Sequence, residues 1–272
     1  PVQAFSIDDS HTTEIDDALS LQGLGTGTVT VGIHIAAPGL ALTPGSAIDQ
    51  LGRARLSTVY MPGYKITMLP DSVVQAYTLI EGRACPAVSL YVTFSEDTLD
   101  VQHTETRLER VNILANLRHD QLDQTITREW LEADDADTPA DLPVDRVTLA
   151  FFWRLAQTLK ARREVVRGKP ESFNRPDYSF KLDRPSNDVP PTGEETVLIG
   201  VRQRGAPLDL MVAEAMILAN STWGQWLASL GVPGIYRSQA SMAPGVKVRM
   251  GTKALPHAGI GVPSYAWSTS PL

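Results

Sequence analysis

The stretch FSIDDSHTTEIDDAL, residues 5–19, places five carboxylates within ten residues and includes no Lys or Arg. Short apolar pieces flank a Ser/His/Thr bend, so a reversal of the backbone would bring Asp8 beside Asp16 and Asp17. Carboxylates that close repel and raise one another's pKa, whereas a divalent cation relieves the repulsion. The stretch therefore predicts a hairpin that binds a cation, and the alternative is a solvated acidic turn.

The ligand chemistry of this stretch favours Mg²⁺, or Mn²⁺, over Zn²⁺, because its donors are hard oxygens with no Cys and little His. Ile7, Ile15 and Leu19 frame the acids and indicate that they emerge from buried structure. Cys85 is the single cysteine of the chain. It cannot form an internal disulfide, which is typical of a reducing cytoplasm.

Length and composition indicate a globular chain with one large or two medium cores. The 272 residues are 43% hydrophobic, and no apolar run approaches the length of a membrane span. We therefore expect a cytoplasmic monomer that has no membrane partner. The chain starts at Pro1 and stops at Leu272 without a closing element, so we expect a C-terminally truncated fragment of a longer protein.

The net charge of −7 argues against a general nucleic-acid binder, but the charges are unevenly distributed. Residues 1–50 contain no Lys or Arg, whereas residues 215–272 contain no Asp or Glu. A second basic run covers residues 160–175. One acidic pole with two basic stretches suits a polyanion whose reacting phosphate meets metal ions while other phosphates meet arginines. Ordinary solvated helix charge is the alternative for the run in the 160s.

Hydrophobic periodicity predicts a mixture of strands and helices. Alternation predicts strands over residues 28–36, 86–94 and 197–201, and places His34 in the first strand as a hydrogen-bonded structural histidine. Helices are expected over residues 46–56, 145–167 and 208–230. Residues 104–131 also appear helix-permissive, with an apolar stripe made of Leu108, Val111, Leu114, Ala115 and Leu122.

A predicted helix and a predicted loop contain further candidate ligand contacts. Glu214 shares a helix face with Met211 and Leu218, where a carboxylate is costly unless it is paired. Neutralisation by an arginine and contact with a ligand are both open at this point. Tyr60 and Tyr64 lie in a Pro/Gly-punctuated loop beside Lys65, where they either stack on bases or pin the loop to the body.

Four sequence blocks together resemble a known family. The opening block is followed by YMPG (60–63) with MLP (68–70), then AEAMILAN (213–220), then YAWSTSP (265–271). In this order they resemble the RNB catalytic domain of the ribonuclease II and ribonuclease R exoribonucleases. Four blocks in this order, spanning nearly the whole chain, argue against a chance similarity.

The resemblance implies one RNB catalytic domain over residues 1–272, without the oligonucleotide-binding folds that usually flank it. The implied fold is mixed α/β, with a largely antiparallel sheet packed with helices around a narrow channel for single-stranded RNA. The implied activity is processive 3′-to-5′ hydrolysis of single-stranded RNA to nucleoside 5′-monophosphates by a two-metal-ion displacement.

The resemblance also implies a role for individual residues. Asp8 and Asp17 would hold Mg²⁺, Asp16 would assist the attacking water, and Glu14 would complete the cluster. Tyr60 would stack on a base near the 3′ end. Glu214 would touch the terminal ribose hydroxyls, through which such a site distinguishes RNA from DNA. Further RNA contacts are expected from Phe173, as a second stacking residue, and Arg175.

Three departures from the family pattern favour alternatives. The family usually has Asp where Glu14 stands, and a Tyr near the cleaved phosphate where the best match here is His119. The arginines that follow Ser-Pro-Leu in the family would lie beyond Leu272. One alternative is therefore a catalytically weakened RNA-binding module. A third, more distant interpretation is a Mg²⁺-dependent phosphatase of small phosphate esters.

Overall fold

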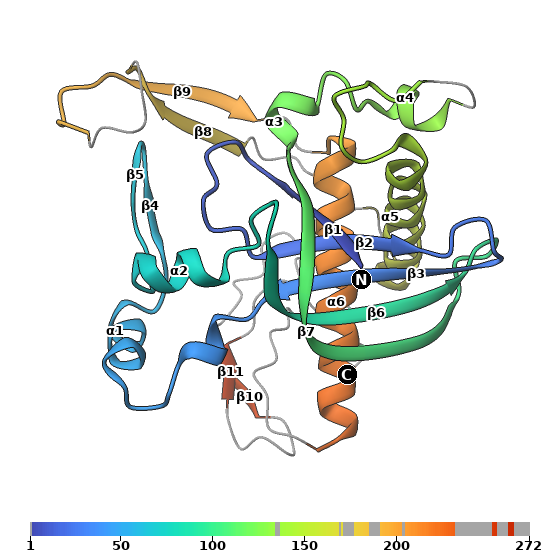
Figure 1. Ribbon diagram of the computed structural model, residues 1–272, viewed down its shortest axis with the longest axis horizontal. Helices are drawn as coiled ribbons and strands as arrows, with labels where there is room; N and C mark the ends of the chain where they lie inside the picture. The colour runs from blue at the N-terminus through green and yellow to red at the C-terminus, as the bar shows by residue number, and fades with distance from the viewer. Residues whose placement is uncertain are drawn as a thin grey trace.

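The computed structural model describes residues 2–133, 137–168, 170, 177–184, 191–202, 205–231, 252–254 and 261–263. Its centre is a closed five-stranded barrel (Figure 1). The strands follow the order β1-β2-β3-β6-β7, with bounds β1 (Gln3–Asp8), β2 (Asp17–Gln22), β3 (Thr28–Ala36), β6 (Ala84–Ser95) and β7 (Val101–Arg118). All pairs are antiparallel except β1 with β7. The predicted mixed α/β fold with a largely antiparallel sheet is confirmed.

The parallel pairing of β1 with β7 closes the barrel. Its register runs from Gln3 opposite Asn112 to Asp8 opposite Arg118. Asn116 reinforces the closure, because its Nδ2 donates hydrogen bonds to Ser6 Oγ and to the Leu79 carbonyl, each at 2.9 Å. The carboxyl end of β1 is thereby fixed beside the end of β7.

Helices α5 (Arg146–Arg167) and α6 (Pro207–Ser229) pack against one face of the sheet (Figure 1). Residues that alternate along the strands, such as Phe5, Val31 and Leu90, form one buried cluster with these helices. The opposite face carries a second, smaller cluster of buried side chains, which includes Ala4, Ala18, Cys85, Ala87 and Val111. Both faces of the sheet are therefore buried in places, and the acids sit where the strands end.

The expected helix over residues 104–131 is wrong for residues 104–118, whereas short helices do begin at His119 and at Arg128. Residues 101–118 instead form the long strand β7, which pairs with β6 from Ala84 opposite Asn112 to Phe94 opposite Val101. Burial follows a period of two, since Val111, Ile113, Ala115 and Leu117 are buried while Leu114 is 46% exposed. The apolar positions of this segment fit both periods locally, and pairing with β6 decided between them.

The other predicted elements are confirmed. Residues 46–56 contain α1 (Ala47–Arg55), and both long helices and the strands β3, β6 and β9 lie at the predicted positions. Asp145 caps α5 by accepting a hydrogen bond from the Thr148 amide at 2.7 Å. Within the described ranges, every helix is too short or too polar to cross a bilayer.

Short elements surround the barrel. The hairpins β4–β5 and β8–β9 lie near each other in Figure 1. Arg184, which follows β8, donates a hydrogen bond from Nη2 to the Gly63 carbonyl in the turn of β4–β5 at 3.0 Å. The remaining bounds are η1 (Pro38–Ala41), β4 (Val59–Met61), β5 (Tyr64–Ile66), α2 (Asp71–Tyr77), α3 (His119–Leu122), α4 (Arg128–Glu132), β8 (Asp177–Leu182), β9 (Val197–Arg202), β10 (Thr252–Ala254) and β11 (Gly261–Pro263).

His34 is fully buried in the sheet and hydrogen-bonded through both ring nitrogens. Its Nε2 lies 2.8 Å from Ser20 Oγ, and its Nδ1 lies 2.7 Å from Ser89 Oγ. The predicted hydrogen-bonded structural histidine is confirmed. Burial lowers the pKa of His34 from 6.5 to about 4.

This depressed pKa predicts acid sensitivity. The unfolded chain protonates this histidine below pH 6.5 while the folded chain keeps it neutral, so stability is lost as the pH falls from 6.5 to 4. We expect His34 to cost about 3 kcal/mol of the free energy of unfolding by the lower end of that interval. Urea unfolding of the wild type and His34→Gln across this range measures the difference in slope. His103→Gln, on the exposed part of β7, is the control, and equal slopes for all three proteins would contradict the prediction.

Candidate active site

Three carboxylates meet at one end of the hairpin formed by β1 and β2. Asp8 ends β1 and Asp17 begins β2, and the register of Phe5 opposite Leu19, extended along the strands, places Asp8 opposite Asp16. The backbone carbonyl of Asp16 accepts a hydrogen bond from the Ala36 amide at 2.8 Å. The hairpin predicted from the sequence is confirmed. We call Asp8, Asp16 and Asp17 the acidic cluster.

The bend between these strands is held by the segment that follows β7. Arg118 Nη1 donates hydrogen bonds to the carbonyl of Asp9 at 2.9 Å and to that of Thr12 at 3.2 Å. The amide and the hydroxyl of Ser10 both donate to the Asp120 carboxylate, at 2.8 and 2.6 Å. Residues more than a hundred positions away therefore fix the bend that carries the acids.

Burial raises the pKa of all three members of the acidic cluster, and neighbouring acids add to the shift at Asp16 and Asp17. The pKa of Asp17 rises to about 7, through burial first and then through the charges of Asp8 and Asp16. Burial also raises the pKa of Asp16, with Glu14 and Asp8 adding to the shift and Lys65 opposing it. Burial raises the pKa of Asp8 in spite of a 2.5 Å hydrogen bond from Ser6 Oγ. A bound cation would relieve this repulsion.

The ligand chemistry of the acidic cluster fits Mg²⁺ or Mn²⁺. Its donors are carboxylate oxygens, and their mutual repulsion is the property that a divalent cation offsets. Among the residues that the structure describes, no three Asp, Glu, His or Cys side chains are arranged to hold a metal ion as they stand. The fit of the acidic cluster to a divalent cation therefore rests on its donor chemistry and on the repulsion between its acids.

Glu14, the fourth acid that the resemblance assigns to this site, forms hydrogen bonds with residues outside the acidic stretch. Its Oε1 accepts a hydrogen bond from Lys65 Nζ at 2.7 Å, and its Oε2 accepts one from Thr58 Oγ1 at 3.3 Å. The acidic stretch contains no Lys or Arg of its own, but β5 supplies Lys65. Nothing in the local sequence indicated this pairing, although Lys65 stood beside the predicted stacking tyrosines.

Tyr60 lies next to the acids on the exposed hairpin β4–β5. Its side chain is 72% exposed, and the charges of Glu14 and Asp16, after burial of the phenol, raise its pKa. Tyr60 pairs with Lys65 across the hairpin, whereas Tyr64 pairs with Met61. Adjacent residues of a strand point to opposite faces, so Tyr64 lies on the other face. An aromatic ring beside the acidic cluster is thus available for stacking.

His119 also lies near the acidic cluster. It begins α3 directly after β7, is buried, and lowers the pKa of Asp8 through its charge when protonated. Its Nδ1 lies 3.9 Å from Asp123 Oδ2. The residue that the resemblance matched to a tyrosine near the cleaved phosphate is therefore placed at the junction of strand and helix beside Asp8.

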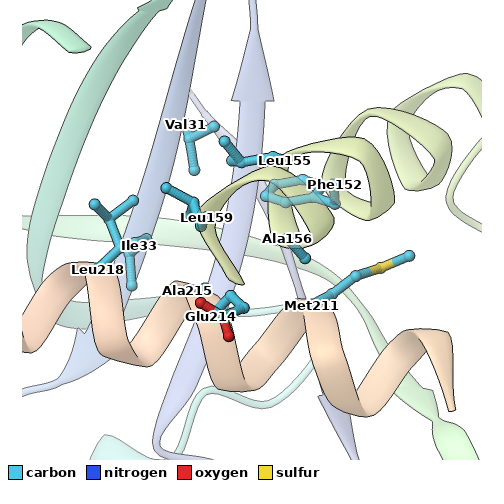
Figure 2. A pocket seen from close by; sticks show the side chains of 10 residues that line it. All are labelled: Val31, Ile33, Phe152, Leu155, Ala156, Leu159, Met211, Glu214, Ala215 and Leu218. Atoms are coloured by element: carbon cyan, nitrogen blue, oxygen red, sulfur yellow. The ribbon is translucent and has the colours of Figure 1, made fainter. Parts of the chain in front are cut away.

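Glu214 is buried between the two long helices, with 2% of its surface exposed. It forms an ion pair with Arg163 of α5, which confirms neutralisation by an arginine. Figure 2 shows Glu214 in an apolar pocket, and none of the pocket residues belongs to the acidic cluster. The lining consists of Val31, Ile33, Phe152, Leu155, Ala156, Leu159, Met211, Glu214, Ala215 and Leu218. Contact of Glu214 with ribose hydroxyls stays a prediction.

Two predicted RNA contacts, Phe173 and Arg175, lie outside the described residues, as does the block at residues 265–271. Other site residues were missed by sequence reasoning. Arg118 and Asp120, which hold the bend, show no local motif, because their role depends on the closure of the barrel by β7.

Comparison with known proteins finds relatives over most of the chain. Exoribonuclease 2 of Vibrio parahaemolyticus is 29% identical over 246 residues, which cover 89% of this chain and 34% of that protein. The chain thus spans about a third of the length of the curated relatives it matches.

Two solved structures share the fold. Mycoplasma genitalium RNase R in complex with ribose methylated single-stranded RNA matches with a TM-score of 0.68 and 18% identity, over 87% of this chain and 34% of that one. Yeast Ssd1, a pseudonuclease, matches with a TM-score of 0.61 and 20% identity, over 88% of this chain and 26% of that one. At these identities the likeness concerns the fold alone. The family model of the RNB domain matches residues 2–246, most of the sequence, and the chain therefore belongs to the RNB domain family.

Proposed function

We propose that this chain is the catalytic domain of a Mg²⁺-dependent exoribonuclease that processively removes nucleoside 5′-monophosphates from the 3′ end of single-stranded RNA. The observation that carries the proposal is the convergence of Asp8, Asp16 and Asp17 beside the exposed ring of Tyr60. Membership of the RNB family and similarity to exoribonuclease 2 support it. Mn²⁺ would serve in place of Mg²⁺ with the same donors.

The residues of the acidic cluster have different proposed roles. Asp8 and Asp17 would hold the ions, and Asp16, the most exposed of the three acids, would accept a proton from the attacking water. Mg²⁺ held by these residues would supply the chemistry of a two-metal displacement, which is neutralisation of charge at the phosphate and a lower pKa of the attacking water. His119, close to Asp8, donates a hydrogen bond to the phosphate, which would make the rate depend on pH.

Contacts with the rest of the RNA set the preference for a single strand and for ribose. Tyr60 stacks on a base near the 3′ end, a contact that tolerates any base because every base has a π-face. Glu214 accepts a hydrogen bond from a terminal ribose hydroxyl while Arg163 orients its carboxylate. Phe173 and Arg175 are proposed as further contacts with the strand.

The direct test uses single-stranded RNA labelled at its 5′ end, with Mg²⁺ or with EDTA, and single-stranded DNA of the same sequence as the control. We expect the full-length RNA to be converted to a short end product with few intermediates, nucleoside 5′-monophosphates to be released, and neither to occur in EDTA or with DNA. Internal cleavage of the labelled RNA would contradict the proposal, and so would release that is unaffected by EDTA.

Tyr60→Ala is expected to weaken the binding of single-stranded RNA by about tenfold, because one base loses its stacking partner. The matched control is Tyr64→Ala, which removes the same side chain from the other face of the same hairpin. Fluorescence anisotropy of a labelled RNA in EDTA measures both. Equal losses for the two variants would show that the hairpin contributes general aromatic surface rather than a specific stacking position.

A second candidate function is an RNA-binding module with weakened hydrolysis. Two observations favour it: Glu14 is occupied by Lys65, and a histidine stands where the resemblance expects a tyrosine. Tight binding of RNA without release of nucleotides in Mg²⁺ or Mn²⁺ would establish this function and exclude the first.

A further inference from the structure

The ion pair between Glu14 and Lys65 joins two parts of the site that are 51 residues apart in the chain. Glu14 lies in the acidic bend, and Lys65 lies on β5 of the hairpin that carries Tyr60. The pair is partly buried, with 15% of the Glu14 side chain and 26% of the Lys65 side chain exposed. A partly buried pair of this kind is less screened than one on an open surface.

A second hydrogen bond strengthens the connection. Thr58 Oγ1 donates to Glu14 Oε2 at 3.3 Å and also accepts a hydrogen bond from the Met68 amide at 3.1 Å. Thr58 and Met68 flank the hairpin on its two sides. One carboxylate therefore contacts the lysine within the hairpin and the threonine where the chain enters it.

The geometry of the hairpin places Lys65 and Tyr60 together. They are direct cross-strand partners, and side chains at such positions share one face of a hairpin. The turn of the hairpin is held separately by the hydrogen bond from Arg184 to the Gly63 carbonyl. Gly63 adopts a φ of +68°, and a Cβ there would lie 2.6 Å from Leu182 Cδ1. The turn and the base of the hairpin are thus both anchored, the base through Glu14.

We propose that the Glu14–Lys65 ion pair sets the position of Tyr60 relative to the acidic cluster, so that Glu14 is a positioning residue for the RNA and not a metal ligand. This inference rests on the proposed function. Both carboxylate oxygens of Glu14 already accept hydrogen bonds from the hairpin segment, and a bound ion would have to displace them. Lys65 also places a positive charge near Asp16, which lowers the repulsion among the acids without using Glu14 as a ligand.

The first test measures RNA binding in EDTA, where no hydrolysis takes place. Glu14→Gln and Lys65→Gln are each expected to weaken binding by about fivefold, and the double variant by no more than either single variant, because both break one interaction. A 2-aminopurine at the 3′ end of the RNA should lose part of its quenching in both. Lys181→Gln, which removes an exposed lysine of β8, controls for the loss of positive charge. The exchanged pair Glu14→Lys/Lys65→Glu should recover at least half of the lost affinity.

The second test measures the binding of Mn²⁺ by electron paramagnetic resonance, without RNA. Glu14→Gln and Lys65→Gln should leave the Mn²⁺ concentration at half-saturation within about twofold of the wild-type value. Asp8→Asn should raise that concentration by at least about tenfold. A comparable rise for Glu14→Gln would make it a metal ligand and overturn the inference. Additive losses of RNA affinity in the double variant would also overturn it.

A third measurement separates failure of this inference from failure of the proposed function. If the wild type neither binds RNA nor releases nucleotides, the proposed function fails. Amide hydrogen exchange over residues 59–66 still decides whether the ion pair holds the hairpin. Faster exchange in both Glu14→Gln and Lys65→Gln, but not in Lys181→Gln, supports the positioning role. Unchanged exchange in both variants overturns it.

Discussion

The Asp17→Asn substitution is expected to lower the rate of mononucleotide release by about a thousandfold, since a missing metal ligand costs several kcal/mol of transition-state stabilisation. Burial first, and then the charges of Asp8 and Asp16, raise the pKa of Asp17 to about 7. Asparagine keeps the shape of the side chain and removes its charge. Single-turnover release from 3′-labelled RNA at saturating Mg²⁺ measures the loss.

The matched control for this substitution is Asp9→Asn. Asp9 lies in the same bend, where its Oδ1 accepts a hydrogen bond from the His11 amide at 3.0 Å, and it has no place in the sequence signature. We expect Asp9→Asn to keep at least half of the wild-type rate. Circular dichroism should show that Asp17→Asn remains folded, because the change removes charge repulsion. An Asp17→Asn rate above a tenth of the wild type would contradict the assignment.

The Arg163→Met substitution is expected to lower the free energy of unfolding by about 3 to 5 kcal/mol, because it leaves the carboxylate of Glu214 buried without its cation. Glu214 is 2% exposed and lies among apolar side chains of α5, α6 and β3 (Figure 2). Urea unfolding followed by circular dichroism measures the change. A charge buried in such surroundings is costly in proportion to its loss of solvation.

Two comparisons give this prediction its specificity. Arg163→Met/Glu214→Leu should recover most of the loss, since an apolar pair suits the pocket. Arg128→Met breaks the exposed ion pair with Glu132 on α4, and it should cost less than about 1 kcal/mol. If Arg163→Met and Arg128→Met lower the free energy of unfolding by the same amount, the ion pair between α5 and α6 is solvated in solution. A purely structural role for that ion pair is then excluded.

The fold was predictable wherever local periodicity was unambiguous. The strand over residues 28–36 alternates cleanly, and the helix over residues 145–167 has both a capping Asp145 and a terminal Gly168. The segment over residues 101–118 was misassigned because its apolar residues fit a helical stripe as well as one face of a strand. Its long antiparallel partner β6 is a non-local feature, and no window of the sequence contains it.

The candidate site was predictable to the same extent. Asp8, Asp16 and Asp17 come together through a short hairpin, so their proximity follows from neighbouring residues. The partners of Glu14 and Glu214 do not follow from neighbouring residues. Glu14 meets Lys65 across 51 residues, and Glu214 meets Arg163 at the same sequence separation. The apolar face of its helix showed that Glu214 needed a partner but did not show whether that partner was an arginine or a ligand.

The closure of the barrel by β1 and β7 has a consequence for when the site is complete. Ser6 and Asn116, which join these strands, are 110 residues apart, and contacts over such distances form late because the entropy of closing the loop must first be overcome. The bend that carries the acids is held by Arg118 and Asp120, just past the end of β7. A nascent chain that has not yet extruded these residues from the ribosome, or one that has begun to unfold, lacks the scaffold of the site. The proposed site is therefore complete only in molecules that have finished folding.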